Sequence, residues 1–233
     1  MSMPLRRPQP RAHSRIAFFH GARSTVIAAA PAVGRRGFVA GVGREAAYVV
    51  ADGFVIVLTL APPVLPNGAQ VARLPPSGAE VTVGADEVWD PTLRVGDVAL
   101  AADGPDDLAR AVLERDPELA AAAGARLIGH GRGLTPEGDD LVCGVAAVVA
   151  SLPWPEASRR KWLAALLGGE LRRRTTALSA TLLELAALGM GPEPLQALVA
   201  GDASARPRLE AIGHSTGPAI ARGAGLGLLG LDA

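Results

Sequence analysis

The segment GHGRGLTPEGDDLVCGVAAVVASL, residues 129–152, decides how the C-terminal half of this 233-residue chain folds. Thr135 followed by Pro136 has the form of a helix N-cap with proline at the first helical position. The residues after Asp140 are apolar on every side of a helix and rich in Gly and Ala, which is typical of a helix closely surrounded by others. The segment therefore predicts a central helix from Pro136 to about Ser151, with Cys143 as a small buried residue.

On either side of this helix the chain follows two different patterns. Residues 15–104 are short β-branched or apolar runs separated by Gly, Pro, Asn and Asp, ending with DVALAA at 97–102, and they predict strands of a small sandwich or barrel. From Pro105 on, apolar residues recur at helical spacing. We therefore expect an α+β protein, with a disordered lead-in at 1–14, an antiparallel β sandwich or barrel at 15–104 and a mainly helical domain at 105–233.

Composition excludes several classes of function. Lys+Arg and Asp+Glu both total 23, so no net charge favours nucleic acid or an anionic membrane. Cys143 is the sole cysteine, which excludes an intramolecular disulfide and a thiolate metal cluster and fits a reducing cytoplasm. Lys161 is the sole lysine and no GK[ST] occurs, which removes P-loop chemistry. No charge-free apolar run reaches the roughly 18 residues of a membrane span.

The glycines before the central helix predict a binding site. Glycines at that position can leave backbone N–H groups facing a ligand, and the helix dipole there favours an anion. We expect Gly131, Arg132, Gly133 and Thr135 to bind substrate, with the Arg132 guanidinium adding a bidentate fork. The alternative is a flexible entry to a helix, because 28 of the 233 residues are glycine and acidic residues near a helix start need no ligand.

Two aspartates open the central helix. Adjacent helical residues point about 100° apart, so Asp139 and Asp140 cannot both reach solvent if the helix is central. We expect at least one of them to meet an arginine, a substrate or a metal ion, with Mg²⁺ as the candidate ion.

The sequence IGHGRGLTP at 128–136 is echoed by IGHSTGP at 212–218. Both segments place a histidine before a glycine, a proline and a helix, so we expect two helix N-termini to share a site that includes His130, His214, Ser215 and Thr216. Chance similarity in a glycine-rich chain is the alternative. GHSTG also matches the nucleophile elbow of serine hydrolases, but the preceding pattern is helical and no histidine follows Ser215.

A third segment, RRRTTALS at 172–179, ends one predicted helix and begins another. Positive charge is favoured at a helix C-terminus, and Thr175 or Thr176 is expected to cap the next helix. Arg174 with these two threonines would also form a phosphate or carboxylate pocket if the fold brings them near residue 135.

These motifs, together with WDP at 89–91 and PNG at 66–68, resemble a bacterial family long labelled a domain of unknown function, which includes the AllH subunit of oxamate carbamoyltransferase. The resemblance runs in order from about residue 20. It implies a component of an enzyme of anaerobic allantoin breakdown, in purine degradation, that phosphorolyses oxalurate to oxamate and carbamoyl phosphate together with other chains. The Ser-Thr-Arg-Thr element of the ordinary carbamoyltransferases does not occur here, so their carbamoyl phosphate site is not carried over.

Two functions are consistent with the sequence. In the first, a carbamoyltransferase subunit, Arg132 and the N–H groups of residues 131–135 hold an anion, and Asp139 or Asp140 binds Mg²⁺ or orients the carbamoyl amino group. His130 and His214 stabilise charge or move protons. In the second, the chain is a non-catalytic anion-binding or assembly subunit that regulates a partner enzyme. Both functions require a small carboxylate or phosphate-containing ligand and partner proteins.

Overall fold

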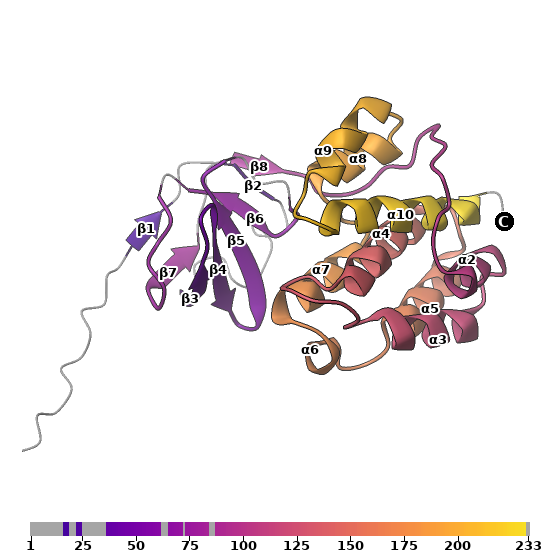
Figure 1. Ribbon diagram of the computed structural model, residues 1–233, viewed down its shortest axis with the longest axis horizontal. Coiled ribbons are helices and arrows are strands. Elements are labelled where there is room, and N and C mark those ends of the chain that lie inside the picture. Colours follow the sequence, from indigo (N-terminus) through magenta and orange to yellow (C-terminus); the bar gives the residue numbers. More distant parts are fainter. Residues whose placement is uncertain are drawn as a thin grey trace, which may run out of the picture.

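The computed structural model describes residues 16–18, 22–24, 36–61, 65–71, 73–83 and 87–231. The lead-in expected at 1–14 and much of the first part of the strand region expected from residue 15 lie outside these residues. A sheet occupies one side of the molecule and helices the other (Figure 1). The α+β class predicted from the sequence is confirmed.

The strands form one curled sheet, in the order β1-β7-β3-β4-β5-β6-β2-β8. The sheet is mixed and not purely antiparallel as predicted. Antiparallel pairs join β3 to β4 and β7, β4 to β5, and β2 to β6, whereas β1–β7, β2–β8 and β5–β6 are parallel. The strands are β1 (Ile16–Phe18), β2 (Ala22–Ser24), β3 (Arg36–Val42), β4 (Ala46–Ala51), β5 (Phe54–Thr59), β6 (Gly68–Gln70), β7 (Glu80–Val83) and β8 (Glu87–Trp89).

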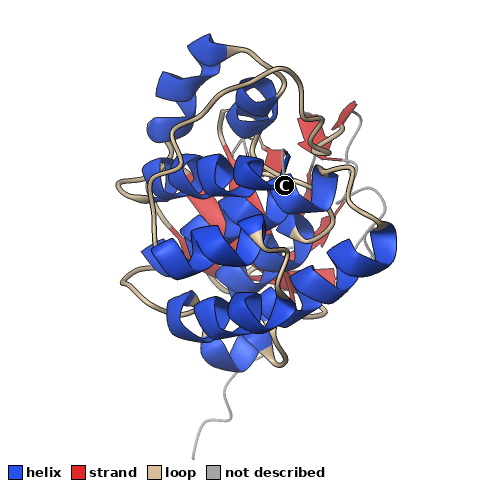
Figure 2. Cartoon of the chain, turned by 90° about the vertical axis from the view of Figure 1, so that its right-hand side faces the viewer, coloured by secondary structure: helices blue, strands red, loops and turns tan. Residues whose placement is uncertain are grey.

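Strand β5 is buried on both faces and joins two hydrophobic cores. Neighbouring residues of a strand point to opposite faces of the sheet. Val55 and Val57 therefore pack into the core of the helices, while Ile56 and Leu58 belong to a second core on the other face. A strand covered on both faces needs a continuous apolar run, which FVIVLT supplies. Seen from the helical side, the helices lie in front of the strands (Figure 2).

The second part of the chain is helical, and α4 lies at its centre. The helices are α2 (Asp106–Leu113), α3 (Pro117–Leu127), α4 (Glu137–Ser151), α5 (Glu156–Leu167), α6 (Leu171–Arg174), α7 (Ala177–Ala186), α8 (Glu193–Val199), α9 (Arg206–Glu210) and α10 (Thr216–Leu228), with short 3-10 helices η1 (Ala203–Ala205) and η2 (Leu229–Leu231). Helix α4 contacts α3, α5, α7 and α10, and it is buried from Gly138 to Val149. In the described part of the chain, no helix has the length and apolar character needed to cross a membrane.

The predicted start of α4 needs a correction. The helix begins at Glu137, and its N-cap residue is Pro136, whose extended backbone has φ −54° and ψ 141°. The residue expected to cap the helix, Thr135, forms no capping hydrogen bond because its hydroxyl is directed to another helix, described below.

The run DVALAA, expected to be a strand, lies in a connection without helix or strand between Trp89 and Asp106. The connection is held by the helical part instead of the sheet. Leu93 N–H donates to Gly189 O at 2.7 Å, and Gly96 N–H donates to Val199 O at 2.8 Å. These bonds fix the chain just before DVALAA, and within the run the side chains of Val98 and Leu100 pack against the core of the helices.

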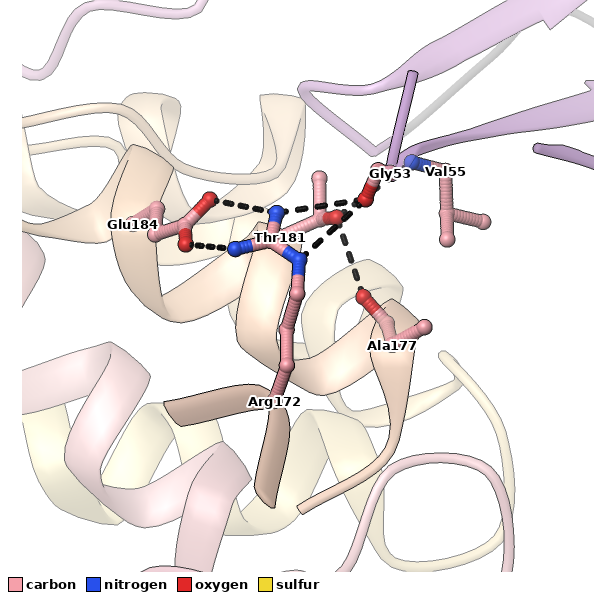
Figure 3. A network of polar contacts seen from close by, with 6 residues as sticks. All are labelled: Gly53, Val55, Arg172, Ala177, Thr181 and Glu184. Atoms are coloured by element: carbon pink, nitrogen blue, oxygen red, sulfur yellow. Dashed lines mark hydrogen bonds and ion pairs between the residues drawn. The ribbon is translucent and has the colours of Figure 1, made fainter. Parts of the chain in front are cut away.

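Polar contacts fasten the β4–β5 hairpin to α6 and α7 (Figure 3). The buried hydroxyl oxygen of Thr181 accepts a hydrogen bond from Val55 N–H at 3.3 Å. Arg172 donates two hydrogen bonds to Gly53 O, from Nε at 3.3 Å and from Nη2 at 3.2 Å. Its guanidinium also forms an ion pair with Glu184. These contacts fix the sheet against the helices that carry the candidate site.

Candidate functional site

The N-terminal ends of α4, α7 and α10 meet at one place. The hydroxyl oxygens of Thr135, before α4, and Thr216, the first residue of α10, lie 2.9 Å apart in a hydrogen bond. Thr176 caps α7 by accepting from Ser179 N–H at 3.1 Å, as predicted, and its hydroxyl donates to Leu134 O at 2.5 Å. The two echoed segments and the Thr-Thr segment are thus neighbours in space.

Helices α4 and α10 run parallel and side by side (Figure 1), because glycines allow their backbones to touch. A Cβ on Gly144 would lie 2.2 Å from Ile220 O, and one on Gly223 would lie 2.1 Å from Leu141 O. Parallel packing places two positive dipole ends together, an arrangement that negative charge nearby stabilises. Neither N-terminus is capped by a side chain, since Pro136 and Ser215 form no such hydrogen bond.

Asp139 is fully buried and holds two loops in place. Its Oδ1 accepts from Gly129 N–H at 2.6 Å, and its Oδ2 accepts from the hydroxyl of Thr175. Both carboxylate oxygens are therefore engaged with the chain itself. We assign Asp139 the role of fixing the loop before α4, residues 129–135, to the turn between α6 and α7. We call this loop the glycine loop.

Asp140, the next residue, is 1% exposed, and its Oδ2 has no hydrogen-bond partner. Burial raises the pKa of its carboxyl group to about 7, and this effect outweighs hydrogen bonding from the Thr216 and Thr135 hydroxyls, which lowers the pKa. The charges of Asp139 and Glu137 raise the pKa further. At neutral pH the group is therefore divided between its acid and carboxylate forms.

A small cavity of about 20 Å³ adjoins Asp140. Its walls come from three helices (α4, α7 and α10), from the region that runs from Met190 into α8, and from the turn before β6. The lining residues are Leu65, Pro66, Asp140, Cys143, Ala147, Leu182, Ala186, Met190, Gly191, Pro192, Leu195, Thr216 and Ile220. The sequence did not identify Leu65, Pro66 or Met190 as site residues, although Pro66 belongs to the PNG motif.

The glycine loop lies at the surface above these helix ends. Residues 130 to 134 are exposed, as is His214, and within the described chain the N–H groups of residues 131–135 donate to no backbone carbonyl. Gly131 and Gly133 have φ values of 125° and 93°, which L side chains rarely adopt. The nearby helix ends have no side-chain cap, although Gly138 N–H and Gly217 N–H already donate to the carbonyls of His130 and Ile212. Free N–H groups at such a place can bind an anion.

Arg174 is occupied with structural contacts. Its Nη1 donates to Leu167 O at 2.7 Å and its Nη2 to Gly124 O at 2.8 Å, so the guanidinium ties the C-terminal parts of α5 and α3 together. Arg132, in contrast, is exposed in the glycine loop. No cluster of three His, Cys, Asp or Glu side chains suited to a metal ion occurs within the described residues.

A second, wider hollow of about 290 Å³ lies beside the start of α4. His130, Gly131, Glu137 and Arg222 line it, with Glu137 Oε1 accepting from Arg222 Nη1 at 3.1 Å. His130 therefore faces this hollow, whereas Thr216 and Asp140 line the smaller cavity.

Comparison with known proteins finds a family match in the helical part. Residues 127–228 match the family model described as oxamate carbamoyltransferase subunit AllH. The matched range starts before the glycine loop and ends with α10, so it contains all three converging helix ends and leaves the sheet outside. The family resemblance predicted from the motifs is confirmed over this range. No curated protein and no solved structure matches the chain.

Proposed function

We propose that this chain is a subunit of an oxamate carbamoyltransferase-type enzyme of allantoin and purine nitrogen catabolism. The reaction converts oxalurate and phosphate into oxamate and carbamoyl phosphate. A phosphate oxygen attacks the carbamoyl carbon, the bond from that carbon to the amide nitrogen breaks, and the nitrogen takes up a proton. The observation that supports the proposal most is that the range matching the family model contains the whole convergence of α4, α7 and α10.

In this proposal the glycine loop holds the anion. Arg132 and the N–H groups of residues 131–135 bind phosphate or the substrate carboxylate at the uncapped ends of α4 and α10. His130 and His214, both exposed, stabilise developing charge or move protons. Ser215 and Thr216 contribute hydroxyl groups at the start of α10.

The Mg²⁺ ion that the sequence led us to expect at Asp139 and Asp140 stays a prediction. Both oxygens of Asp139 accept hydrogen bonds from the chain, and the described residues hold no cluster of three metal-ligating side chains, so an ion here would depend on substrate phosphate and water for most of its ligands. Mg²⁺ is usually bound by one or two carboxylates together with substrate phosphate and water. Assays with EDTA, and with Mg²⁺ added back, test whether the ion takes part.

The decisive experiment measures carbamoyl phosphate release from oxalurate and phosphate. The full chain is assayed alone and with the protein partners that co-purify with it, because the family name describes a subunit. Activity in either assay supports the proposal, and inactivity in both contradicts it.

The alternative is a non-catalytic anion-binding or assembly subunit that regulates a partner enzyme. The exposure of both histidines favours it, because a catalytic base is more often held by a buried neighbour. His130→Gln and His214→Gln separate the two functions. A catalytic role predicts a loss of kcat of about 100-fold or more, whereas a regulatory role predicts an unchanged kcat with altered anion affinity.

A further inference from the structure

We propose that the cavity beside Asp140 is the subsite for the amino end of a primary amide or carbamoyl group, whose N–H donates to Asp140 Oδ2. The inference rests on the proposed function for the choice of ligand, and its location rests on the geometry of the cavity. It assigns Asp140 to recognition of the uncharged end of the ligand, opposite the end held by the glycine loop.

The first argument is the unpaired oxygen. A buried polar atom without a partner is costly, and native structures contain few of them. Asp140 is 1% exposed, its Oδ2 has no partner, and its residue lines the cavity. None of the described residues that line this cavity is Lys, Arg or His, so none of them places a cation beside the carboxylate.

The second argument is the size and lining of the cavity. A volume of about 20 Å³ accommodates one water molecule or one amino group, and not a phosphate group. Apart from Asp140 and the Thr216 hydroxyl, the walls are mainly apolar side chains. A carboxylate placed there would be repelled by Asp140, and a methyl group would leave Oδ2 unpaired. An N–H donor satisfies it.

The third argument is the place of Asp140 beside the converging helix ends. Thr135 and Thr216 bridge from this position toward the uncapped helix ends. In the proposal, a ligand with an amide at one end and an anion at the other has its amide in the cavity and its anion toward these helix ends.

The test compares oxamate with pyruvate by calorimetric titration of the unmodified full chain at pH 7. Both are small 2-oxo carboxylates, and they differ by an amino group in place of a methyl group. We expect oxamate to bind at least about tenfold more tightly, since pyruvate leaves the buried oxygen unpaired. Equal affinity for the two ligands, or no binding of oxamate, overturns the proposal and leaves the cavity as the place of a water molecule.

A variant tests whether the preference for oxamate over pyruvate depends on Asp140. Asp140→Leu keeps the approximate size and removes the acceptor, so we expect the preference for oxamate to fall to about twofold or less. Glu118→Gln, which removes an exposed carboxylate from the first turn of α3, is the matched control and should keep the full preference. An unchanged preference in Asp140→Leu contradicts the assignment, and the ligand comparison on the unmodified chain decides the matter if this variant does not fold.

The two proposals fail separately. If the chain turns over oxalurate but shows no preference for oxamate that depends on Asp140, the subsite proposal is wrong and the proposed reaction stands. If the preference depends on Asp140 but no turnover occurs, alone or with partners, the subsite stands and the proposed catalytic function is wrong.

Discussion

Asp140 opposes the stability of the folded chain, and the effect depends on pH. Because burial raises the pKa of its carboxyl group to about 7, the folded chain keeps the proton between pH 4 and 7, where the unfolded chain releases it. Ionisation of this residue therefore lowers the free energy of unfolding as pH rises through that range, and the decrease is complete above pH 7.

Asp140→Asn is expected to remove this dependence. Relative to the unmodified chain, the variant should gain about 1.4 kcal/mol of unfolding free energy per pH unit between pH 4 and 7, and the gain should level off above pH 7. Urea unfolding at half-unit pH steps measures it. Glu118→Gln is again the control, and a constant difference between Asp140→Asn and the unmodified chain across this range would falsify the raised pKa.

Cys143 is expected to resist thiol reagents in the folded protein. The side chain is 9% exposed, and burial raises the pKa of its thiol well above the usual value, with Asp140 and Asp139 raising it further. Labelling with a chromogenic disulfide reagent should be slow in buffer and fast in denaturant. Cys143→Ala should cost about 1 kcal/mol, and rapid labelling under native conditions would contradict the buried placement.

At the scale of elements, the contact between α4 and α10 depends on glycine. Gly144→Ala would place a methyl group 2.2 Å from Ile220 O, and a backbone carbonyl cannot move aside as a side chain can. We expect a loss of about 3 kcal/mol or more in the free energy of unfolding, or failure to fold.

Gly169→Ala is the matched control for this contact. Nothing lies within 4 Å of the Cβ it would add, and its φ is not positive. Its unfolding free energy should stay within about 0.5 kcal/mol of the unmodified chain. Equal stability of the two variants in urea unfolding would show that the helices separate without cost.

The sequence predicts elements well where one local pattern decides them. The apolar run after Asp140 predicted a central helix because helix period and burial agree there, and Thr176 was recognised as a cap from its position. The sequence wrongly predicted Thr135 as the cap of α4. The Thr135 hydroxyl is hydrogen-bonded to Thr216, which is 81 residues away and so gives no local signal. DVALAA has the composition of a strand, and tertiary contacts with the helical part decided otherwise.

The candidate site was predictable in part for the same reason. Repeated motifs indicated that 128–136 and 212–218 belong together, and the structure joins them. The sequence could not show that both oxygens of Asp139 are engaged by the chain while Oδ2 of Asp140 has no partner, because adjacent aspartates look alike until the surrounding loops are placed.

At the scale of the whole molecule, the sheet and the helices are expected to unfold together. Val55 and Val57 of β5 pack in the core of the helices, and Val55 N–H donates to Thr181. Thr181→Val removes the buried acceptor and should cost about 1–3 kcal/mol. The loss should appear equally in far-ultraviolet circular dichroism and in hydrogen exchange of the β4–β5 amides.

Thr181→Ser keeps the hydroxyl and separates the hydrogen bond from packing. It should lose less stability than Thr181→Val. If the amides of β5 exchange faster in Thr181→Val while the helical signal keeps its midpoint, the two parts unfold independently and the shared core does not couple them.

The wall that Leu65 and Pro66 form over the cavity comes from outside the range that matches the AllH family model. Two of the residues that shape the cavity therefore come from a part of the chain that the family match does not cover. The turn before β6 can be changed without altering the matched range. Exchanging its side chains would resize the cavity for a different terminal group, while Asp140 and the helix ends keep their positions.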